Sequence, residues 1–297
     1  MKRSRNAIID LKQEVTDRIV KAIEDGRMSP GNLWARSQGG GLPINYATKN
    51  PYSGTNVLLL WLEAADRGFA RNEWMTYKQA QDIGAQVRRG AKHCRLLKVA
   101  QRERVDPETG EIEFFPAPVP FSVFNVEEID GVAPATRYEE FEPVAVAEQI
   151  LTRSGATIIE TGERAFYRMS TDECFLPERT RFESAANFYH VAVHELTHWT
   201  AHPERLARDL SGRFGDEAYA FEELVAEFGA AFCLARIGMD AGQLEFHASY
   251  LDSWLRVLKK DKNALFTAAS RASDAYAYLM KLARISDAAS PQMRAAA

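Results

Sequence analysis

The 297-residue chain contains only three cysteines, Cys94, Cys174 and Cys233, and no two of them form a C-x-x-C pair. Three scattered cysteines argue against a disulfide framework and against a cysteine zinc ribbon. Such sparse use of cysteine is typical of proteins in a reducing compartment. We therefore expect a cytoplasmic location.

The sequence also lacks a long hydrophobic run. No segment approaches the roughly eighteen apolar residues that a membrane-spanning helix needs. The basic start of the chain, residues 1–6, is followed by Ala7, Ile8 and Ile9 and then by Asp10, so it has no signal-peptide core. We expect no membrane partner. The chain also contains no C2H2 finger, Walker A loop or RNP1-like run.

The charge is unevenly distributed along the chain. The formal net charge of −4 comes from 37 Lys and Arg against 41 Asp and Glu. Residues 1–130 hold 19 basic and 17 acidic residues, and residues 67–104 alone hold ten basic and three acidic ones. A local excess of positive charge on a mildly acidic protein indicates an anionic partner such as nucleic acid.

The pattern of apolar residues predicts an α+β fold with two units. A small mixed α/β domain covers residues 1–130, a linker covers 131–145, and a helix-rich domain covers 146–297. Apolar residues at helical spacing predict helices near 7–26, 56–66, 76–86, 144–153, 181–200, 216–237, 244–259 and 263–284. Strand-like patterns lie near 95–100, 113–124, 156–160 and 164–168, with a hairpin turn over 106–110.

The most informative motif is His194-Glu195-Leu196-Thr197-His198, inside a predicted helix. Two histidines four residues apart lie on one face of a helix, so both imidazoles can reach one metal ion. Glu195 between them would then be the catalytic base that takes a proton from a water beside the metal.

The third metal ligand is expected from the segment Phe221-Glu222-Glu223-Leu224-Val225-Ala226-Glu227. Glu223 and Glu227 are four residues apart on one helix face. We expect Glu223 to bind the metal and Glu227 to accept the second N–H of a ligand histidine. The reverse assignment stays open. Two histidines, one glutamate and a water suit Zn²⁺, although Mn²⁺ or another divalent ion can occupy such ligands.

A simpler interpretation is that the histidines are partly buried polar residues and that the glutamates form a solvated helix face. Against it, Val191, Val193, Leu196 and Trp199 make the surroundings largely apolar. Two histidines and a glutamate in such surroundings need a compensating partner, and a metal ion supplies one. Whether this metal is catalytic or structural is left open by the residues themselves.

Aromatic and basic residues alternate in the first unit, as in surfaces that hold single-stranded nucleic acid by stacking and by phosphate contacts. For Trp74 the alternative is core packing, and for the basic residues a solvated turn. The DNA-binding candidates are Lys49, Tyr52, Arg71, Trp74, Lys78, Arg88, Arg89 and Lys92.

Several motifs, in order along the chain, resemble the ArdC antirestriction family. The N-terminal ones are Leu42-Pro43-Ile44-Asn45, Tyr52-Ser53-Gly54-Thr55-Asn56, Trp74-Met75-Thr76-Tyr77-Lys78-Gln79-Ala80, Gly84-Ala85-Gln86-Val87-Arg88-Arg89-Gly90 and Phe121-Ser122-Val123-Phe124-Asn125-Val126. The C-terminal ones are the histidine motif with Trp199 and the segment Tyr219–Glu227. One departure is visible, because the Thr-Gly usual before the Tyr-Ser-Gly turn is here Thr48-Lys49.

The resemblance implies a plasmid-type protein that binds single-stranded DNA (ssDNA) nonspecifically and protects incoming DNA from host restriction. It also implies that residues 146–297 form a zincin-like metallopeptidase domain. The N-terminal domain of this family also occurs in plasmid primases that act during conjugation. Restriction enzyme subunits or other DNA-bound proteins would then be the substrates. Two alternatives remain: a DNA-dependent metalloprotease acting on DNA-bound proteins, or a pure ssDNA-binding module with a structural metal.

Overall fold

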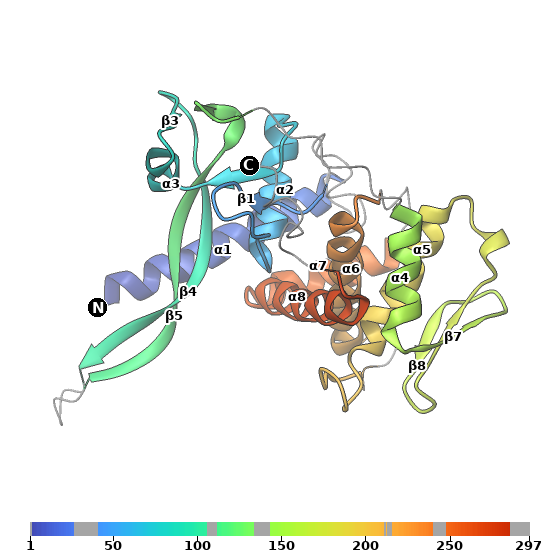
Figure 1. The fold of residues 1–297 in the computed structure, drawn as a ribbon. Helices are drawn as coiled ribbons and strands as arrows, with labels where there is room; N and C mark the ends of the chain where they lie inside the picture. The colour runs from blue at the N-terminus through green and yellow to red at the C-terminus, as the bar shows by residue number, and fades with distance from the viewer. Residues whose placement is uncertain are drawn as a thin grey trace.

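The computed structural model describes residues 2–26, 41–105, 112–133, 143–210, 212, 216–239 and 248–285. Figure 1 shows a β-rich N-terminal part beside a group of C-terminal helices. In chain order the N-terminal part contains α1 (Lys2–Glu24), β1 (Ile44–Asn45), α2 (Thr55–Arg67), β2 (Glu73–Met75), α3 (Tyr77–Asp82), β3 (Gln86–Val87), β4 (Cys94–Val105), β5 (Ile112–Asn125), the 3-10 turn η1 (Val126–Glu128) and β6 (Ile129–Asp130).

The C-terminal part is mainly helical. It contains α4 (Pro143–Ser154), β7 (Thr157–Glu160), β8 (Phe166–Arg168), β9 (Glu173–Leu176), the 3-10 turn η2 (Arg179–Arg181), α5 (Ala185–Trp199), α6 (Glu217–Arg236), α7 (Ala248–Lys260) and α8 (Ala264–Ala283). Together with the sheets of the first part, these elements confirm the predicted α+β class.

The described strands form three small sheets. The N-terminal sheet has the order β1-β2-β5-β4, in which β2, β5 and β4 are antiparallel neighbours. Strands β3 and β6 pair separately, and β7-β9-β8 form a mixed sheet beside α5. The pairing of β4 with β5 runs over their whole length, from Cys94 opposite Val123 to Val105 opposite Ile112.

Some predicted bounds differ from the structure. The helix expected over 76–86 ends at Asp82, because Gly84 adopts a φ of 75° and its N–H bonds to the Gln81 carbonyl, which closes the helix. Its start is as expected, because Thr76 forms a capping box with Gln79. The strands expected over 95–100 and 113–124 are longer, and β9 was not predicted. The turn at 106–110 and much of the 131–145 linker lie outside the described residues.

One hydrophobic core runs through both parts of the described chain. Helices α1 and α2 contribute to it together with α5, α6 and α8. Trp61 of α2 packs against Phe232 of α6 with ring centroids 5.8 Å apart. At the start of α2, the Gly54 N–H donates to Ser273 Oγ of α8 at 2.8 Å. Because the core is shared, the two predicted domains are in direct contact, and their boundary at 130–146 stays a prediction.

Helix α6 is the centre of the C-terminal part. Its residues from Leu224 to Ala235 are all buried, as expected of a helix that is apolar on every side. It packs against α5, α7 and α8. Within the described residues, no helix has both the length and the apolar content needed to cross a membrane.

Candidate functional site

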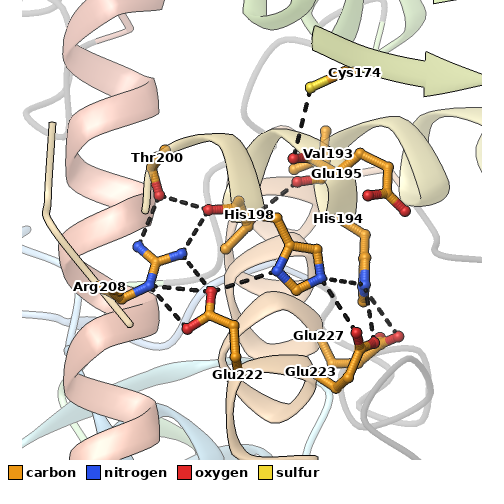
Figure 2. Close-up of polar contacts among 11 residues, drawn as sticks. Cys174, Val193, His194, Glu195, His198, Thr200, Arg208, Glu222, Glu223 and Glu227 are labelled. Carbon is orange, nitrogen blue, oxygen red and sulfur yellow. Dashed lines mark hydrogen bonds and ion pairs between the residues drawn. The ribbon is translucent and has the colours of Figure 1, made fainter. Parts of the chain in front are cut away.

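Two helices bring the candidate metal ligands together. Helix α5 begins at the cap residue Ser184, whose side chain accepts a hydrogen bond from the Asn187 N–H. Its 3.6-residue period places the motif histidines on the side that faces α6. Figure 2 shows three glutamates of α6 pointing at these histidines, namely Glu222, Glu223 and Glu227.

Three side chains converge on one point. His198 Nε2 lies 3.2 Å from His194 Nε2. Two oxygens of Glu223 lie 3.4 Å from His194 Nε2 and 3.5 Å from His198 Nε2. Corners of a tetrahedron around an ion with bonds of about 2.0–2.1 Å are about 3.3–3.4 Å apart. The donor set of His194, His198 and Glu223 therefore fits a tetrahedral metal ion.

The Nδ1 atoms of the two histidines face carboxylates. His194 Nδ1 lies 3.2 Å from Glu227 Oε1, and His198 Nδ1 lies 3.4 Å from Glu222 Oε1. A neutral imidazole that donates through Nδ1 has a lone pair on Nε2. Two neutral imidazoles of this kind would direct their Nε2 lone pairs at each other and at a carboxylate, an arrangement that a metal ion between them would stabilise. The donor set therefore fits a divalent metal ion.

Behind Glu222 and Glu227 lies a further layer of buried partners. Arg208 is 8% exposed, and its guanidinium donates to Glu222, to the Thr197 carbonyl and to Thr200 Oγ1. Glu227 in turn contacts His190 Nε2 at 3.1 Å. These contacts fix the rotamers of the two glutamates. The sequence analysis assigned no role to Glu222 or Arg208. It also assigned none to His190, although His190 lies four residues before His194 and so continues the spacing of the two motif histidines.

Buried charges of opposite sign shift the pKa values in the site. Burial by itself opposes protonation of His198, but the adjacent Glu222 and Glu223 carboxylates outweigh burial and raise its pKa to about 9. Burial opposes ionisation of Glu227, but His194 and His190 outweigh it and lower the Glu227 pKa to about 2. In the absence of a metal, protonated His194 and His198 together with Arg208 balance the three ionised glutamates, and a divalent cation would displace the two histidine protons.

Glu195 lies beside this donor set and does not belong to it. Burial raises the pKa of its carboxyl group. The carboxyl group lines a cavity of about 520 Å³, together with His194, His198 and Tyr219. An acid with a raised pKa in a cavity next to a metal donor set has the properties of a general base.

The nucleic-acid candidates of the first part do not form one surface. Trp74 is completely buried, so its predicted stacking role is wrong: its ring packs edge-on against Phe69. Tyr52 is partly buried, and its hydroxyl bonds to Asn45 and to the Trp74 carbonyl. Arg71 is mostly covered and pairs with Glu73. These three side chains hold the fold together at β1 and β2.

The other basic candidates are exposed. Arg88 pairs with Asp130 at 2.7 Å, although its side chain is 56% exposed. Lys78, Arg89 and Lys92 also lie at the surface. Lys49 has a φ of 60°, the left-handed region that favours glycine, and its ammonium lies 3.9 Å from the centre of the Tyr46 ring. A glycine suits this turn, and the cation–π contact helps to offset the strain of the lysine.

Comparison with known proteins agrees with this geometry. Residues 9–124 match the family described as the N-terminal domain of anti-restriction factor ArdC, and residues 145–271 match the zincin-like metallopeptidase family. A crystal structure of metal-free antirestriction ArdC from plasmid R388 superposes with a TM-score of 0.80 at 37% identity, covering 93% of this chain and 98% of that one. The chain belongs to the ArdC antirestriction family.

Other relatives support the same assignment. The Mn(II)-bound structure of ArdC from R388 has a TM-score of 0.76 at 35% identity and covers 92% of this chain and 98% of that one. An uncharacterized protein, y4eC, of Sinorhizobium fredii is 36% identical over an alignment of 299 positions that covers 97% of this chain and 96% of that protein. The DNA primase TraC of Escherichia coli is 39% identical over an alignment of 283 positions that covers 88% of this chain and 26% of the primase. The ArdC assignment brings with it a zincin-like domain, a class that holds a divalent metal ion.

Proposed function

We propose that this ArdC-family protein binds ssDNA nonspecifically and protects incoming DNA from host restriction. We further propose that its metal is zinc, held by His194, His198 and Glu223, and that the site hydrolyses peptide bonds. Restriction enzyme subunits or other DNA-bound proteins are the proposed substrates. The three cysteines are buried, and sparse buried cysteine is consistent with a cytoplasmic location.

The observation that carries the catalytic part is the position of Glu195. A structural zinc site is closed by four protein ligands, whereas a catalytic one keeps an open position. Here three donors converge at the wall of a cavity, and the buried Glu195 carboxyl lines the same cavity. This combination favours a hydrolytic site over a structural one.

The chain's own residues have distinct roles in the proposed reaction. When bound, a divalent ion at this site supplies a Lewis acid that polarises a peptide carbonyl and makes a water more acidic. The Glu195 carboxylate accepts a proton from the attacking water and later donates it to the leaving amine. Glu222 and Glu227 keep the imidazole rings in place.

The DNA-binding part is supported by the match to the ArdC N-terminal domain and by the basic stretch over residues 67–104. A chain with an overall charge of −4 is not expected to bind DNA through its net charge, so a local cationic surface is required.

Binding to a labelled single-stranded oligonucleotide, compared with its duplex across a range of salt, tests the DNA-binding part. The same titration in the presence of a chelator shows whether ssDNA binding depends on the metal site. We expect tight, salt-sensitive binding that prefers single strands and survives chelation. Equal binding to both forms, or no binding, would contradict the DNA-protection function and leave the metal site as the activity to pursue.

A further inference from the structure

The paired strands β4 and β5 extend beyond the body of the protein. Figure 1 shows the distal half of this two-stranded ribbon projecting away from the helices. The buried residues of the ribbon, such as Leu96 and Val123, lie at its base. The ribbon carries four of the nine large hydrophobic residues that are exposed among the described ones: Val99, Ile112, Phe114 and Phe115. Exposed apolar residues gathered on a projecting element indicate a binding surface.

The strand register divides the distal ribbon into two faces. Residues directly opposite each other in an antiparallel pair have side chains on the same face, and the faces alternate along each strand. Lys98 pairs with Val119, Arg102 with Phe115, and Arg104 with Glu113. These positions share one face, which we call the cationic face. Val99, Glu103, Phe114 and Ile112 belong to the opposite face.

The cations of this face are exposed. Among the side chains that the structure describes, no ion pair joins Lys98 or Arg102 to an acid, whereas Arg71 and Arg88 have carboxylate partners. Arg104 lies directly opposite Glu113 in the strand register. Lys98 lies 5.9 Å from the centre of the Phe121 ring on the same face. The three cations extend over about 20 Å of strand, given a rise of about 3.3 Å per residue.

We propose that the cationic face of the β4–β5 ribbon is the surface that binds ssDNA. The proposal rests on the DNA-binding function proposed above and moves its site away from Trp74 and Arg71. Lys98, Arg102 and Arg104 contact phosphates, and the ring of Phe115, beside Arg102, stacks on an unpaired base. Stacking requires an open base face, which a single strand offers and a duplex covers, so single strands are preferred.

Two triple variants with the same loss of charge test this placement. The first is K98Q/R102Q/R104Q on the ribbon, and the second is R88Q/R89Q/K92Q at the exposed cluster after β3. We expect the ribbon variant to bind a labelled single-stranded oligonucleotide at least tenfold more weakly than the wild type at low salt. Its plot of log affinity against log salt should be flatter by about 2, because each phosphate contact to a single strand contributes about 0.7.

A second pair of variants tests the stacking contact. Phe114 and Phe115 are neighbours on opposite faces of the same strand and are 66% and 39% exposed. We expect F115A to weaken ssDNA binding about fivefold or more and F114A to leave it within twofold. The affinity for duplex DNA should change little, and to the same extent, in F114A and F115A.

The outcomes separate this proposal from the proposed function. If the wild type binds ssDNA and the ribbon triple variant binds as tightly, the ribbon is not the surface, and its cations serve to keep its open strand edges from aggregating. A loss confined to R88Q/R89Q/K92Q would assign the surface to that cluster and overturn the proposal. If the wild type itself does not bind ssDNA, the proposed function fails. Circular dichroism of each variant shows whether the fold is intact.

Discussion

Gly229 of α6 and Thr197 of α5 are in direct contact where the two helices cross. A Cβ atom added to Gly229 would lie 2.7 Å from Thr197 Cγ2 and 2.9 Å from Thr197 Oγ1. Thr197 precedes His198, and Gly229 is two residues after Glu227. The absence of a side chain at position 229 therefore sets how closely the glutamates of α6 approach the histidines of α5.

We predict that G229A destabilises the protein by about 1–3 kcal/mol, because the added methyl group must push the two helices apart. Metal affinity should fall as well, since the donor distances depend on the same crossing. Thermal unfolding and a metal titration measure the two effects. T197A/G229A should recover most of the loss, because it removes both atoms that the methyl group would meet. Similar losses in the single and double variants would show that the contact does not control the site.

Glu222 is predicted to control metal affinity although it is not one of the three proposed ligands. E222Q replaces the charged acceptor of His198 Nδ1 by a neutral one, so the imidazole becomes a weaker ligand. We expect metal affinity to fall by about 10- to 100-fold. Competition with a chromogenic chelator measures the change. E217Q, at an exposed position on the same helix, is the control and should have no effect. An unchanged affinity in E222Q would mean that His198 is oriented by other contacts.

Asp172 links the cavity wall to the end of α5 and gives a prediction for acid stability. Its carboxylate accepts hydrogen bonds from the Tyr167 hydroxyl at 2.8 Å and from Arg205 Nη1 at 3.0 Å. The hydrogen bonds from Arg205 are the largest cause of its lowered pKa. A carboxyl group with a lowered pKa in the folded state stabilises the fold above its unfolded pKa of about 3.9, and this contribution disappears as the pH falls through the folded pKa.

D172N should therefore lower the free energy of unfolding at pH 7, and the difference from the wild type should shrink below about pH 4. Because the Asp172 side chain is 41% exposed, solvent screens the pair, and we expect about 1 kcal/mol or less at pH 7. Urea unfolding between pH 3 and 7 measures it. E163Q, at an acid that is 78% exposed beside Arg181, is the control. A difference that grows on acidification would contradict the assignment.

The sequence was most informative where one helix carries the pattern. The four-residue spacing of His194 and His198 follows from helix geometry alone, and so does that of Glu223 and Glu227. The positions of the two glutamates agree with the roles expected for them. Glu223 faces both Nε2 atoms, and Glu227 faces Nδ1 of His194. Their roles as ligand and support stay predictions until a metal is measured.

The sequence was least informative where tertiary contacts decide. Arg208 lies in a loop after α5 and forms an ion pair with Glu222. A local sequence pattern does not predict such a tertiary contact. Alternating aromatic and basic residues indicated a surface, but Trp74 lies on the buried side of its short strand. The exposed cations of the ribbon lie on strands that project from the body, and projection cannot be predicted from strand periodicity.

We propose that Glu195 performs chemistry that protects DNA, and the substitution E195Q tests this role. The substitution keeps the size of the side chain and leaves His194, His198 and Glu223 unchanged, but an amide cannot accept the proton of a water as a carboxylate does. The measurement is the transfer of unmodified DNA into a restricting host that carries the wild type or E195Q, with metal content and ssDNA binding measured on the purified proteins. We expect E195Q to bind metal and ssDNA like the wild type and to lose protection. Full protection by E195Q would contradict this role and leave ssDNA binding, with a structural metal, as the function.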